Sequence, residues 1–516
     1  MSRSSPSRAI RLAIAGSMAL VACLAVLEAT EPPEPGLDPD AISYLSGAES
    51  IVRDHRVFVM TDDWKSADSV HSLQHFPPGF PAVIAIPRAL GMPPVQAGRL
   101  VVALSALVAV LTLSWLMATV SGSMGALLLP AMLIVTPPVA FIYQSLLSEP
   151  LFLAFVSLTL VCLVRTPGRP ALAGLLATCA ALTRYAGVGV PAAVVLWMFL
   201  DGATARRDRW RRAMLSALPP LGGIGWWTLR NVHRSGPRSL LWFHGGEDLG
   251  DAVREGATTI GHWLAPSLDG MWAGAVSAGT VVLLLVLASR TARRLAPDRW
   301  RDMATWGGEL RLIAAAVLMA AAYAGVVALS RLLVYSSIPF DDRMLAPLAF
   351  LLEIAIAAAL ASWWRDARWS ARAPAAFVVL AWTAASAWST VDAASSALEE
   401  GLDYAHDRWR TSELVEWVRA NGNDRPLFTN YPAALYFHAG RMTRLLPQDA
   451  APDSVRSFTD TLTRRRGLII SFDYDSSAWV VSPKPLLAAL PIRRLIRVRD
   501  GEVWEPVSPV RASPSP

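Results

Sequence analysis

The stretch that decides the fold lies between Leu100 and Val120 and reads LVVALSALVAVLTLSWLMATV, without one charged residue. A helix needs about 20 apolar residues to cross a hydrocarbon core of about 30 Å. Several other stretches have the same character, and of the 516 residues 53% are hydrophobic and only 17% are charged. A soluble globular chain carries about a quarter charged residues. The sequence therefore predicts an α-helical polytopic membrane protein.

Outward from that stretch, apolar runs separated by charged loops predict about eleven transmembrane helices. We expect them near residues 9–27, 97–118, 122–142, 150–164, 170–184, 186–200, 213–229, 271–288, 311–334, 344–362 and 374–391. The first run follows Arg3, Arg8 and Arg11 in the manner of a signal peptide, but the residues after it lack a convincing cleavage site. We therefore interpret it as a retained first helix.

The loops between the apolar runs alternate in charge. Arginines crowd some loops, most strongly at 206–212, whereas aspartate and glutamate occupy the others. Basic loops mark the cytoplasmic face, which indicates a multi-pass protein of a bacterial plasma (inner) membrane with a cytoplasmic N-terminus. The formal net charge of +6 comes from these loops, so we expect contact with membrane lipids and no nucleic-acid partner.

The C-terminal part has a soluble composition. Its patterns predict short buried strands at 426–430 and 467–472 and helices at 408–420 and 454–464. We therefore expect a small extracytoplasmic α/β domain after the membrane helices. The predicted organisation is a transmembrane module at 1–395 with a first outer loop at 28–96, the α/β domain at 396–507 and a disordered tail at 508–516.

Polar side chains from distant parts of the sequence are predicted to meet at the outer face. Ionisable residues at membrane depth are expensive and mark candidate sites. Arg184, flanked by apolar residues on both sides, is the clearest example, although a purely structural ion pair would also explain it. The candidate set is Asp38, Asp40, His71, His75, Glu149, Arg184, Tyr185, Arg230, Asn231, Asp341, Asp342 and Arg343.

Six motifs resemble those of the GT-C glycosyltransferases, multi-pass enzymes that take sugar from a polyprenyl-phosphate carrier. They are Leu37–Leu45 (LDPDAISYL), Phe76–Pro81 (FPPGFP), Ser148–Phe152 (SEPLF), Thr183–Tyr185 (TRY), Trp227 with Arg230–Asn231, and Asp342–Arg343 with Pro347. The likeness covers about residues 9–362, in the family's order. It is nearest to bacterial lipopolysaccharide-core and aminoarabinose transferases and to mannosyltransferase-like families.

The resemblance implies an inverting transfer from a polyprenyl-phosphate-linked sugar donor to a glycan, lipid or protein acceptor. In these enzymes a first-loop aspartate acts as base on the acceptor. Asp40, four residues before Tyr44, is the best match, and Asp38 is the second. The position of Glu149 implies that it orients the acceptor or helps to hold a divalent metal, which some relatives use and others do not.

Charge that grows on the departing phosphate needs cations, and arginine forks suit phosphate oxygens. Arg184 is the first candidate for this role, with Arg230 and Arg343 beside it. Tyr185 and Asn231 are expected to bind the same donor phosphate. A further set of candidates for the acceptor or a metal is His75, His71 and Asp342.

Each of these residues also has a structural explanation. Asp38 before Pro39 has the pattern of a helix N-cap, and Asp40 would then be a first-turn acid stabilised by the helix dipole. The spacing from His71 to His75 fits two metal ligands on a helix, but the flanking residues are typical of a loop. Arg230 and Arg343 could be interfacial anchors.

Two other classes of membrane protein fit parts of the sequence. An O-antigen polymerase or ligase would use similar lipid-linked sugars, but its large loop would come late in the bundle. A transporter would need polar groups near the midplane of the membrane. Glu353, inside the predicted helix at 344–362, is the main residue in favour of a transporter.

Overall fold

The computed structural model describes residues 8–31, 35–60, 64–65, 70–201, 204–235, 249–264, 270–294, 305–333, 338–421, 425–474 and 482–507. The chain forms two compact units. The helical unit contains Met1–Pro35 and Gln74–Glu399, and the loop-and-sheet unit contains Gly36–Leu73 and Glu400–Pro516. Gly36–Leu73, the central part of the predicted outer loop, therefore groups with the C-terminal segment. The tail predicted at 508–516 lies outside the described residues.

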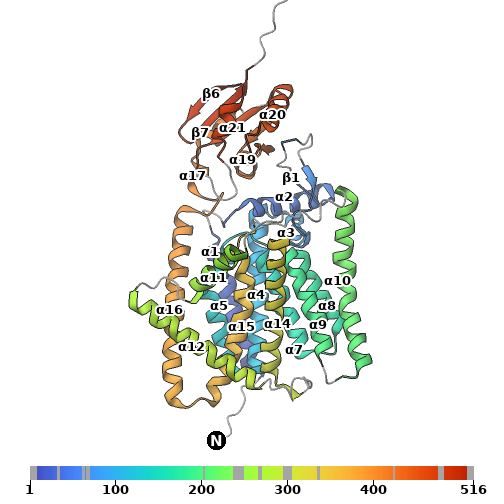
Figure 1. Cartoon of the computed structure of the whole chain (residues 1–516), viewed down its shortest axis with the longest axis vertical. Coiled ribbons are helices and arrows are strands. Elements are labelled where there is room, and N and C mark those ends of the chain that lie inside the picture. Colours follow the sequence, from blue (N-terminus) through green and yellow to red (C-terminus); the bar gives the residue numbers. More distant parts are fainter. Residues whose placement is uncertain are drawn as a thin grey trace, which may run out of the picture. The chain divides into compact units, whose positions relative to one another are not determined.

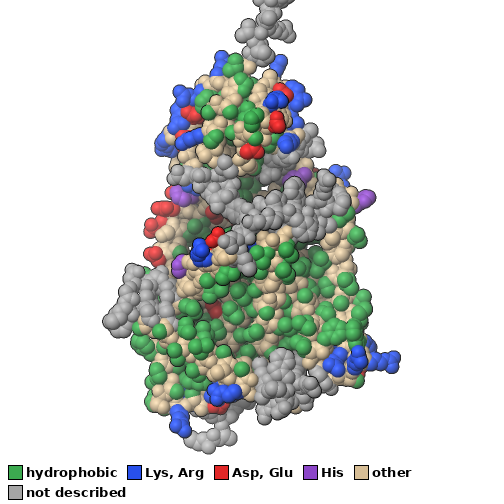
Figure 2. Space-filling model, in the orientation of Figure 1, with side chains coloured by type: hydrophobic (Ala, Val, Ile, Leu, Met, Phe, Trp, Pro, Cys, Tyr) green, Lys and Arg blue, Asp and Glu red, His purple; other side chains and the backbone are tan. Residues whose placement is uncertain are grey.

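The helical unit is built from long apolar helices that run side by side (Figure 1). They are α1 (Arg8–Ala29), α3 (Gly79–Ala89), α4 (Pro94–Val120), α5 (Gly122–Val135), α6 (Pro137–Gln144), α7 (Glu149–Arg165), α8 (Pro170–Thr183), the 3-10 helix η1 (Tyr185–Val188), α9 (Gly189–Leu200), α10 (Arg206–Ser235), α11 (Leu249–Leu264), α12 (Gly270–Arg294), α14 (Gly308–Leu333), α15 (Asp342–Asp366) and α16 (Trp369–Glu400). Apolar side chains cover the face of this unit that Figure 2 shows, as expected for a surface in contact with lipid.

Five of the described helices are long and apolar enough to cross a membrane by themselves: α1, α4, α14, α15 and α16. The bent pair α5 and α6 brings the number to six. The polytopic membrane class is confirmed, whereas the count of about eleven spans stays a prediction. Several of the expected spans are shorter helices, such as α8 and α9.

One predicted helix is wrong as a single element. The stretch expected at 122–142 is bent by 68° between α5 and α6. The reason is local: Pro137 and Pro138 have no backbone N–H to continue the helix, and proline disfavours a helical conformation in the residue before it. Thr136 accordingly has an extended backbone. The sequence analysis also missed α3 and α11, which are too short or too polar for a membrane span, and it predicted α2 only through its N-cap.

The two ends of the helical unit differ in their ion pairs. At one end Arg212 bonds Asp201 at 2.6 Å, and Arg290 bonds Asp366 at 2.7 Å. Arg365, at the end of α15, pairs with Glu309 at the start of α14. These pairs lie in the predicted cytoplasmic loops and are partly exposed. The other end, where α7 and α15 begin and α8 finishes, carries the buried polar residues described below.

The loop-and-sheet unit contains a five-stranded mixed sheet of order β4-β3-β5-β7-β6. Its elements are α2 (Pro39–Asp54), β1 (Phe58–Met60), β2 (Val70–Ser72), α17 (Asp407–Arg410), α18 (Glu413–Asn421), β3 (Leu427–Thr429), α19 (Pro432–Ala439), β4 (Thr443–Leu445), α20 (Pro452–Arg464), β5 (Leu468–Phe472), α21 (Lys484–Ala489), β6 (Ile492–Val498) and β7 (Gly501–Pro506). Strand β3 is parallel to β4 and β5, and β7 is antiparallel to β5 and β6. The C-terminal α/β domain is therefore confirmed.

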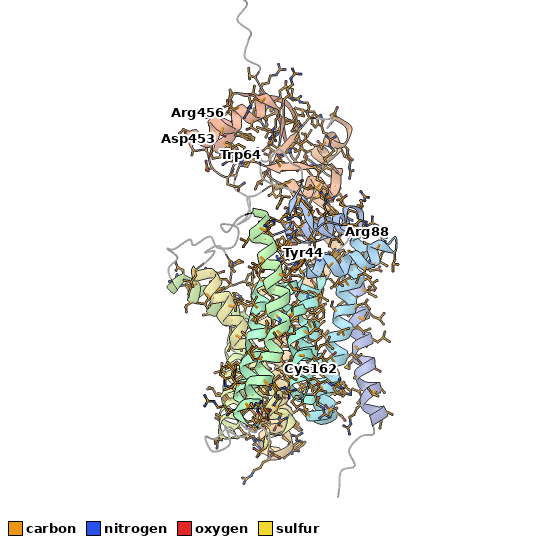
Figure 3. All side chains as sticks on the ribbon, turned by 90° about the vertical axis from the view of Figure 1, so that its right-hand side faces the viewer. Tyr44, Trp64, Arg88, Cys162, Asp453 and Arg456 are labelled. Carbon is orange, nitrogen blue, oxygen red and sulfur yellow. The ribbon has the colours of Figure 1, made fainter. Side chains whose placement is uncertain are left out.

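The first-loop helix α2 is tied to the C-terminal part of this unit. The backbone N–H of Tyr404 donates to the carbonyl of Leu37 at 3.0 Å, just before α2. Trp64 packs edge-on against Phe458 of α20 with ring centroids 5.3 Å apart, and Figure 3 labels Trp64 beside this helix. Residues of the predicted outer loop thus complete the core of the sheet domain.

Candidate functional site

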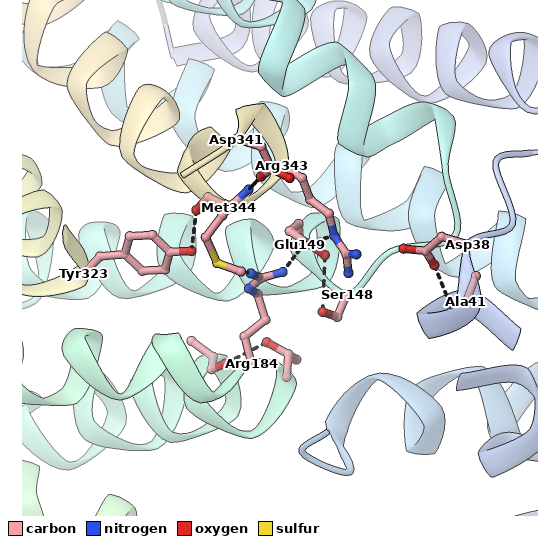
Figure 4. A network of polar contacts seen from close by, with 11 residues as sticks. Asp38, Ala41, Ser148, Glu149, Arg184, Tyr323, Asp341, Arg343 and Met344 are labelled. Carbon is pink, nitrogen blue, oxygen red and sulfur yellow. Dashed lines mark hydrogen bonds and ion pairs between the residues drawn. The ribbon is translucent and has the colours of Figure 1, made fainter. Parts of the chain in front are cut away.

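A buried carboxylate at the start of α7 joins two arginines. The Glu149 side chain is fully buried, and its Oε1 pairs with the guanidinium groups of both Arg184 and Arg343 (Figure 4). Arg343 Nε donates to this oxygen at 2.9 Å. The hydroxyl of Ser148 lies 3.3 Å from Oε2. The structure therefore brings together three of the predicted site residues from distant parts of the sequence.

Local sequence explains how these side chains reach one point. Pro150 follows Glu149 and favours the start of α7. Helix α8 ends at Thr183 because Arg184 has an extended backbone, with φ −146° and ψ 136°. Arg343 lies in the first turn of α15, where the carboxylate of Asp341 accepts the N–H of Met344 at 2.8 Å. All three functional side chains are thus carried by helix ends.

Cations outnumber the carboxylate among the three side chains Glu149, Arg184 and Arg343. One carboxylate faces two guanidinium groups, so the three side chains carry a formal charge of +1. Arg184 is 9% exposed and Arg343 is 23% exposed, which leaves Arg343 the more accessible cation. Planar guanidinium groups bind phosphate or carboxylate through paired hydrogen bonds. The cluster is chemically suited to an anionic ligand.

Tyr323 of α14 supports the same cluster and was missed in the sequence analysis. Its hydroxyl donates to the carbonyl of Met344 at 2.9 Å, and Arg184 contacts the sulfur of Met344 at 3.3 Å. The ring is fully buried. A tyrosine inside an apolar run was the available signal, because a buried phenol needs a hydrogen-bond partner.

A second polar cluster gathers around Tyr185. Its hydroxyl donates to the carbonyl of Gln74 at 2.6 Å and accepts the indole N–H of Trp227 at 3.0 Å. The side-chain amide of Asn231 lies 3.5 Å from the same hydroxyl. Arg230 donates to Asn231 Oδ1 at 2.9 Å and stacks over the Trp227 ring. Three more predicted residues, Tyr185, Arg230 and Asn231, therefore lie together. Tyr185 directly follows Arg184 in the sequence.

The glycine of the Phe76–Pro81 motif has a packing role. A Cβ atom on Gly79 would lie 2.5 Å from the carbonyl oxygen of Leu182 and 3.1 Å from the nitrogen of Thr183. Only glycine allows α3 to approach the last turn of α8 this closely. Since Arg184 follows that turn directly, this contact fixes the backbone from which Arg184 extends.

An apolar groove runs between α9 and α10. Its volume is about 830 Å³, and its lining extends from Val188 and Leu229 to Phe199. Leu229 is followed by Arg230 and Asn231, so one part of the groove adjoins the Tyr185 cluster. An elongated apolar chain with a polar head fits the combination of these features.

In the loop-and-sheet unit, Asp38 is the N-cap of α2, as its sequence predicted. Its Oδ1 accepts the N–H of Ala41 at 2.7 Å, and Pro39 is in the first turn (Figure 4). Asp40 is the acidic residue of that first turn. Burial, and then the nearby Asp38 carboxylate, raise the pKa of the Tyr404 hydroxyl. Tyr404 of the C-terminal segment therefore lies near the start of α2.

The candidates for a metal or acceptor belong to both units, His71 to the loop-and-sheet unit and His75 and Asp342 to the helical unit. His71 is exposed on strand β2, opposite Val59. The four-residue spacing from His71 to His75 therefore does not lie on a helix. His75 packs edge-on against Phe76, and Asp342 accepts the indole N–H of Trp263 at 2.8 Å. Within the described ranges, no three His, Cys, Asp or Glu side chains are arranged to hold a metal ion.

No protein-family model and no curated protein matches the sequence. Solved structures do match. Similar structures include apo ArnT from Cupriavidus metallidurans (TM-score 0.59, 16% identity, covering 95% of this chain and 97% of that chain) and ArnT bound to undecaprenyl phosphate (0.56, 14%, 97% and 99%). A third is the archaeal oligosaccharyltransferase AglB from Archaeoglobus fulgidus with an inhibitory peptide and dolichol-phosphate (0.51, 13%, 88% and 69%). The chain is therefore a polytopic membrane protein with the GT-C fold.

Proposed function

We propose that this protein is a membrane glycosyltransferase that moves a sugar from a polyprenyl-phosphate carrier to a glycan, lipid or protein acceptor. The observation that carries the proposal is the buried Glu149 with its two arginines, which places two guanidinium groups together at one end of a GT-C bundle. The ArnT and AglB structures contain undecaprenyl phosphate and dolichol-phosphate, which supports a lipid phosphate as the anion. The reaction would take place at the outer face of a bacterial plasma membrane.

In this proposal the arginines stabilise the departing lipid phosphate. As the bond between the anomeric carbon and the phosphate oxygen breaks, negative charge grows on the phosphate, and Arg343 and Arg184 offset it. Glu149 holds both guanidinium groups in place, since its carboxylate already contacts both of them. The apolar groove between α9 and α10 is the candidate place for the lipid tail, with Arg230, Asn231 and Tyr185 near its polar end.

Asp40 is the proposed base. It would take the proton of the acceptor hydroxyl as that oxygen attacks the anomeric carbon from the face opposite the phosphate, which inverts the configuration. Asp38 is the weaker candidate because its carboxylate already caps α2. A divalent metal stays a prediction as cofactor, and its sequence-predicted ligands are Glu149, His71, His75 and Asp342.

The experiment uses purified protein in proteoliposomes. A panel of radiolabelled polyprenyl-phosphate sugars and crude envelope acceptor is supplied, and the label that leaves the carrier is followed with and without a chelator. We expect release by the wild type and a loss of about a hundredfold or more in Asp40→Asn. The matched control is Asp54→Asn, which removes an exposed carboxylate from the other end of α2 and should keep the wild-type rate.

Each outcome has a direct meaning. Equal release by the wild type and Asp40→Asn would exclude Asp40 as base and turn attention to Asp38. No release from any donor by the wild type would count against the transferase, and movement of intact carrier across the bilayer would then favour a transporter. Polymerisation of the donor glycan in place of single transfer would favour the O-antigen polymerase class.

A further inference from the structure

Helix α11 presents one stripe of side chains to the segment that precedes Arg343. Glu255, Thr259 and Trp263 are spaced by four residues and therefore lie on the same face of the helix. They contact Phe340 and Asp342, the residues just ahead of Arg343. None of these contacts follows from the sequence motifs, in which α11 has no part.

Glu255 holds Phe340 in two ways. Its Oε1 accepts the backbone N–H of Phe340 at 2.8 Å. Its Oε2 pairs at 2.6 Å with Arg331 of α14, and the guanidinium of Arg331 stacks over the Phe340 ring at 4.5 Å from the centroid. The Arg331 side chain is only 6% exposed, whereas Glu255 is 38% exposed, so only the arginine of this pair is buried. The backbone and the ring of Phe340 are thus both fixed.

Thr259 and Trp263 extend the same contact. The hydroxyl of Thr259 donates to the carbonyl of Phe340 at 2.6 Å, so both backbone polar groups of Phe340 bond to side chains of α11. The indole N–H of Trp263 donates to Asp342 Oδ1 at 2.8 Å. The backbone carbonyl of Trp263 in turn accepts the indole N–H of Trp382 from α16 at 2.8 Å. Helix α11 is therefore anchored on both sides.

We propose that this face of α11 positions Arg343, so that Glu255 and Thr259 are positioning residues for the cation that meets the departing phosphate. The proposal rests on the proposed function. Arg343 follows Asp342 directly, and its Nε reaches Glu149 at 2.9 Å. A shift of the Phe340–Asp342 backbone moves the start of α15 and with it the guanidinium. Misplacement of a charge-stabilising group lowers the rate of the chemical step more than the binding of the substrate.

Two neighbouring threonines supply the test and its control. Thr258 and Thr259 both donate to the carbonyl four residues earlier in α11, at 2.9 Å to Arg254 and 3.1 Å to Glu255. Only Thr259 also reaches Phe340. Thr259→Val should lower kcat by about five- to tenfold with KM within about twofold, as expected for the loss of one hydrogen bond. Thr258→Val should leave both constants unchanged.

A double variant separates positioning from a general loss of structure. If Thr259 acts through Arg343, Thr259→Val should have no further effect on kcat in an Arg343→Gln background. Thr259→Ser, which keeps the hydroxyl, should restore the rate. An equal effect of the two valine substitutions, or multiplication of the Thr259→Val and Arg343→Gln effects, would overturn the proposal.

Hydrogen–deuterium exchange tests the contact without any sugar donor. The N–H groups of Phe340 and Met344 are hydrogen-bonded to Glu255 and Asp341, so a peptide covering 338–344 should exchange slowly in the wild type. Glu255→Ala and Thr259→Val should speed its exchange by several-fold, whereas Thr258→Val should not. Unchanged exchange in Glu255→Ala would refute the contact even if no donor is turned over. Faster exchange with an unchanged kcat would leave α11 a purely structural helix.

Discussion

Two glutamates are buried in the same helical unit, and their surroundings are opposite. Glu149 faces the guanidinium groups of Arg184 and Arg343 at a junction of helix ends. Glu353 lies in the middle of α15, 11 residues after Asp342, or roughly 16 Å along the helix axis. Its described contact is the hydroxyl of Thr136 at 2.5 Å, and its Oε2 has no hydrogen-bond partner among the described residues.

The difference in surroundings indicates which form, ionised or neutral, each carboxyl group can adopt. A buried charge is tolerated when cations and hydrogen bonds surround it, and otherwise costs several kcal/mol. Glu149 is therefore a carboxylate that organises two arginines. Glu353 has no cation beside it among the described residues, so we expect a neutral acid, which bonds to the Thr136 hydroxyl at the bend between α5 and α6.

The largest expected effect is that of Glu149→Gln, which replaces the charged carboxylate with a neutral amide. The change removes the carboxylate charge that pairs with both Arg184 and Arg343 and leaves the two guanidinium groups without this shared partner. We expect a loss of about 3 kcal/mol in the free energy of unfolding and a fall in transfer rate of at least about a hundredfold. Unfolding in detergent, followed by tryptophan fluorescence, and the proteoliposome assay measure the two. Wild-type stability would show that the cluster is not a tight ion pair.

Gly79→Ala tests the support beneath Arg184. Because the new methyl would meet the backbone of Leu182 at 2.5 Å, the end of α8 must move, at a cost of about 1–3 kcal/mol. Its matched control is Gly222→Ala in α10, where a Cβ meets nothing within 4 Å and alanine should be neutral or slightly stabilising. Equal midpoints of thermal unfolding for the two variants would contradict the close contact.

Glu353→Gln tests whether the other buried glutamate is neutral in the folded protein. The amide has the same shape as a protonated carboxyl group and can still bond to Thr136. We expect a change below about 1 kcal/mol in the free energy of unfolding and an unchanged transfer rate. A loss as large as that of Glu149→Gln would mean that Glu353 is ionised and has a partner outside the described residues.

The smallest effect concerns His438 in the loop-and-sheet unit, a half-buried titratable group without an acidic partner in its described contacts. Burial lowers its pKa below the ordinary 6.5, and Arg419 and Arg410 lower it further, although a bond of 2.7 Å to the Tyr404 carbonyl opposes this shift. The neutral form is therefore the native one. Its contribution is complete above pH 6.5 and is lost as the pH falls toward the lower native pKa.

His438→Gln keeps an amide donor near the position of Nε2 for the Tyr404 carbonyl and cannot titrate. Hydrogen exchange of strands β3 and β5 between pH 5 and 7, corrected for the intrinsic rate, should show less acid destabilisation in this variant than in the wild type. Identical pH dependence of the two proteins would mean that His438 is charged in the folded state.

The residues that could be predicted as a group are those whose chemistry is visible without a structure. An arginine between apolar runs must have a reason to be there, so Arg184 was an evident candidate, and Glu149 and Arg343 followed from the ordered motifs. Asp38 before Pro39 predicted a cap that the structure confirms. Tyr323 and Glu255 could not be assigned, because their partners are backbone groups that only the packed helices bring near.

By itself, the sequence determined the membrane class, most helix positions, the α/β nature of the C-terminal segment and the set of polar candidates. The physical reason is that apolar length, prolines, caps and intramembrane charges act locally along the chain. Tertiary structure alone decided which candidates meet: Glu149 with Arg184 and Arg343, Tyr185 with Asn231, and α2 with the sheet domain. Those pairings depend on how helix ends and strands pack. Contacts between residues 46 apart, as for Tyr185 and Asn231, or 194 apart, as for Glu149 and Arg343, leave no local periodicity from which they could be inferred.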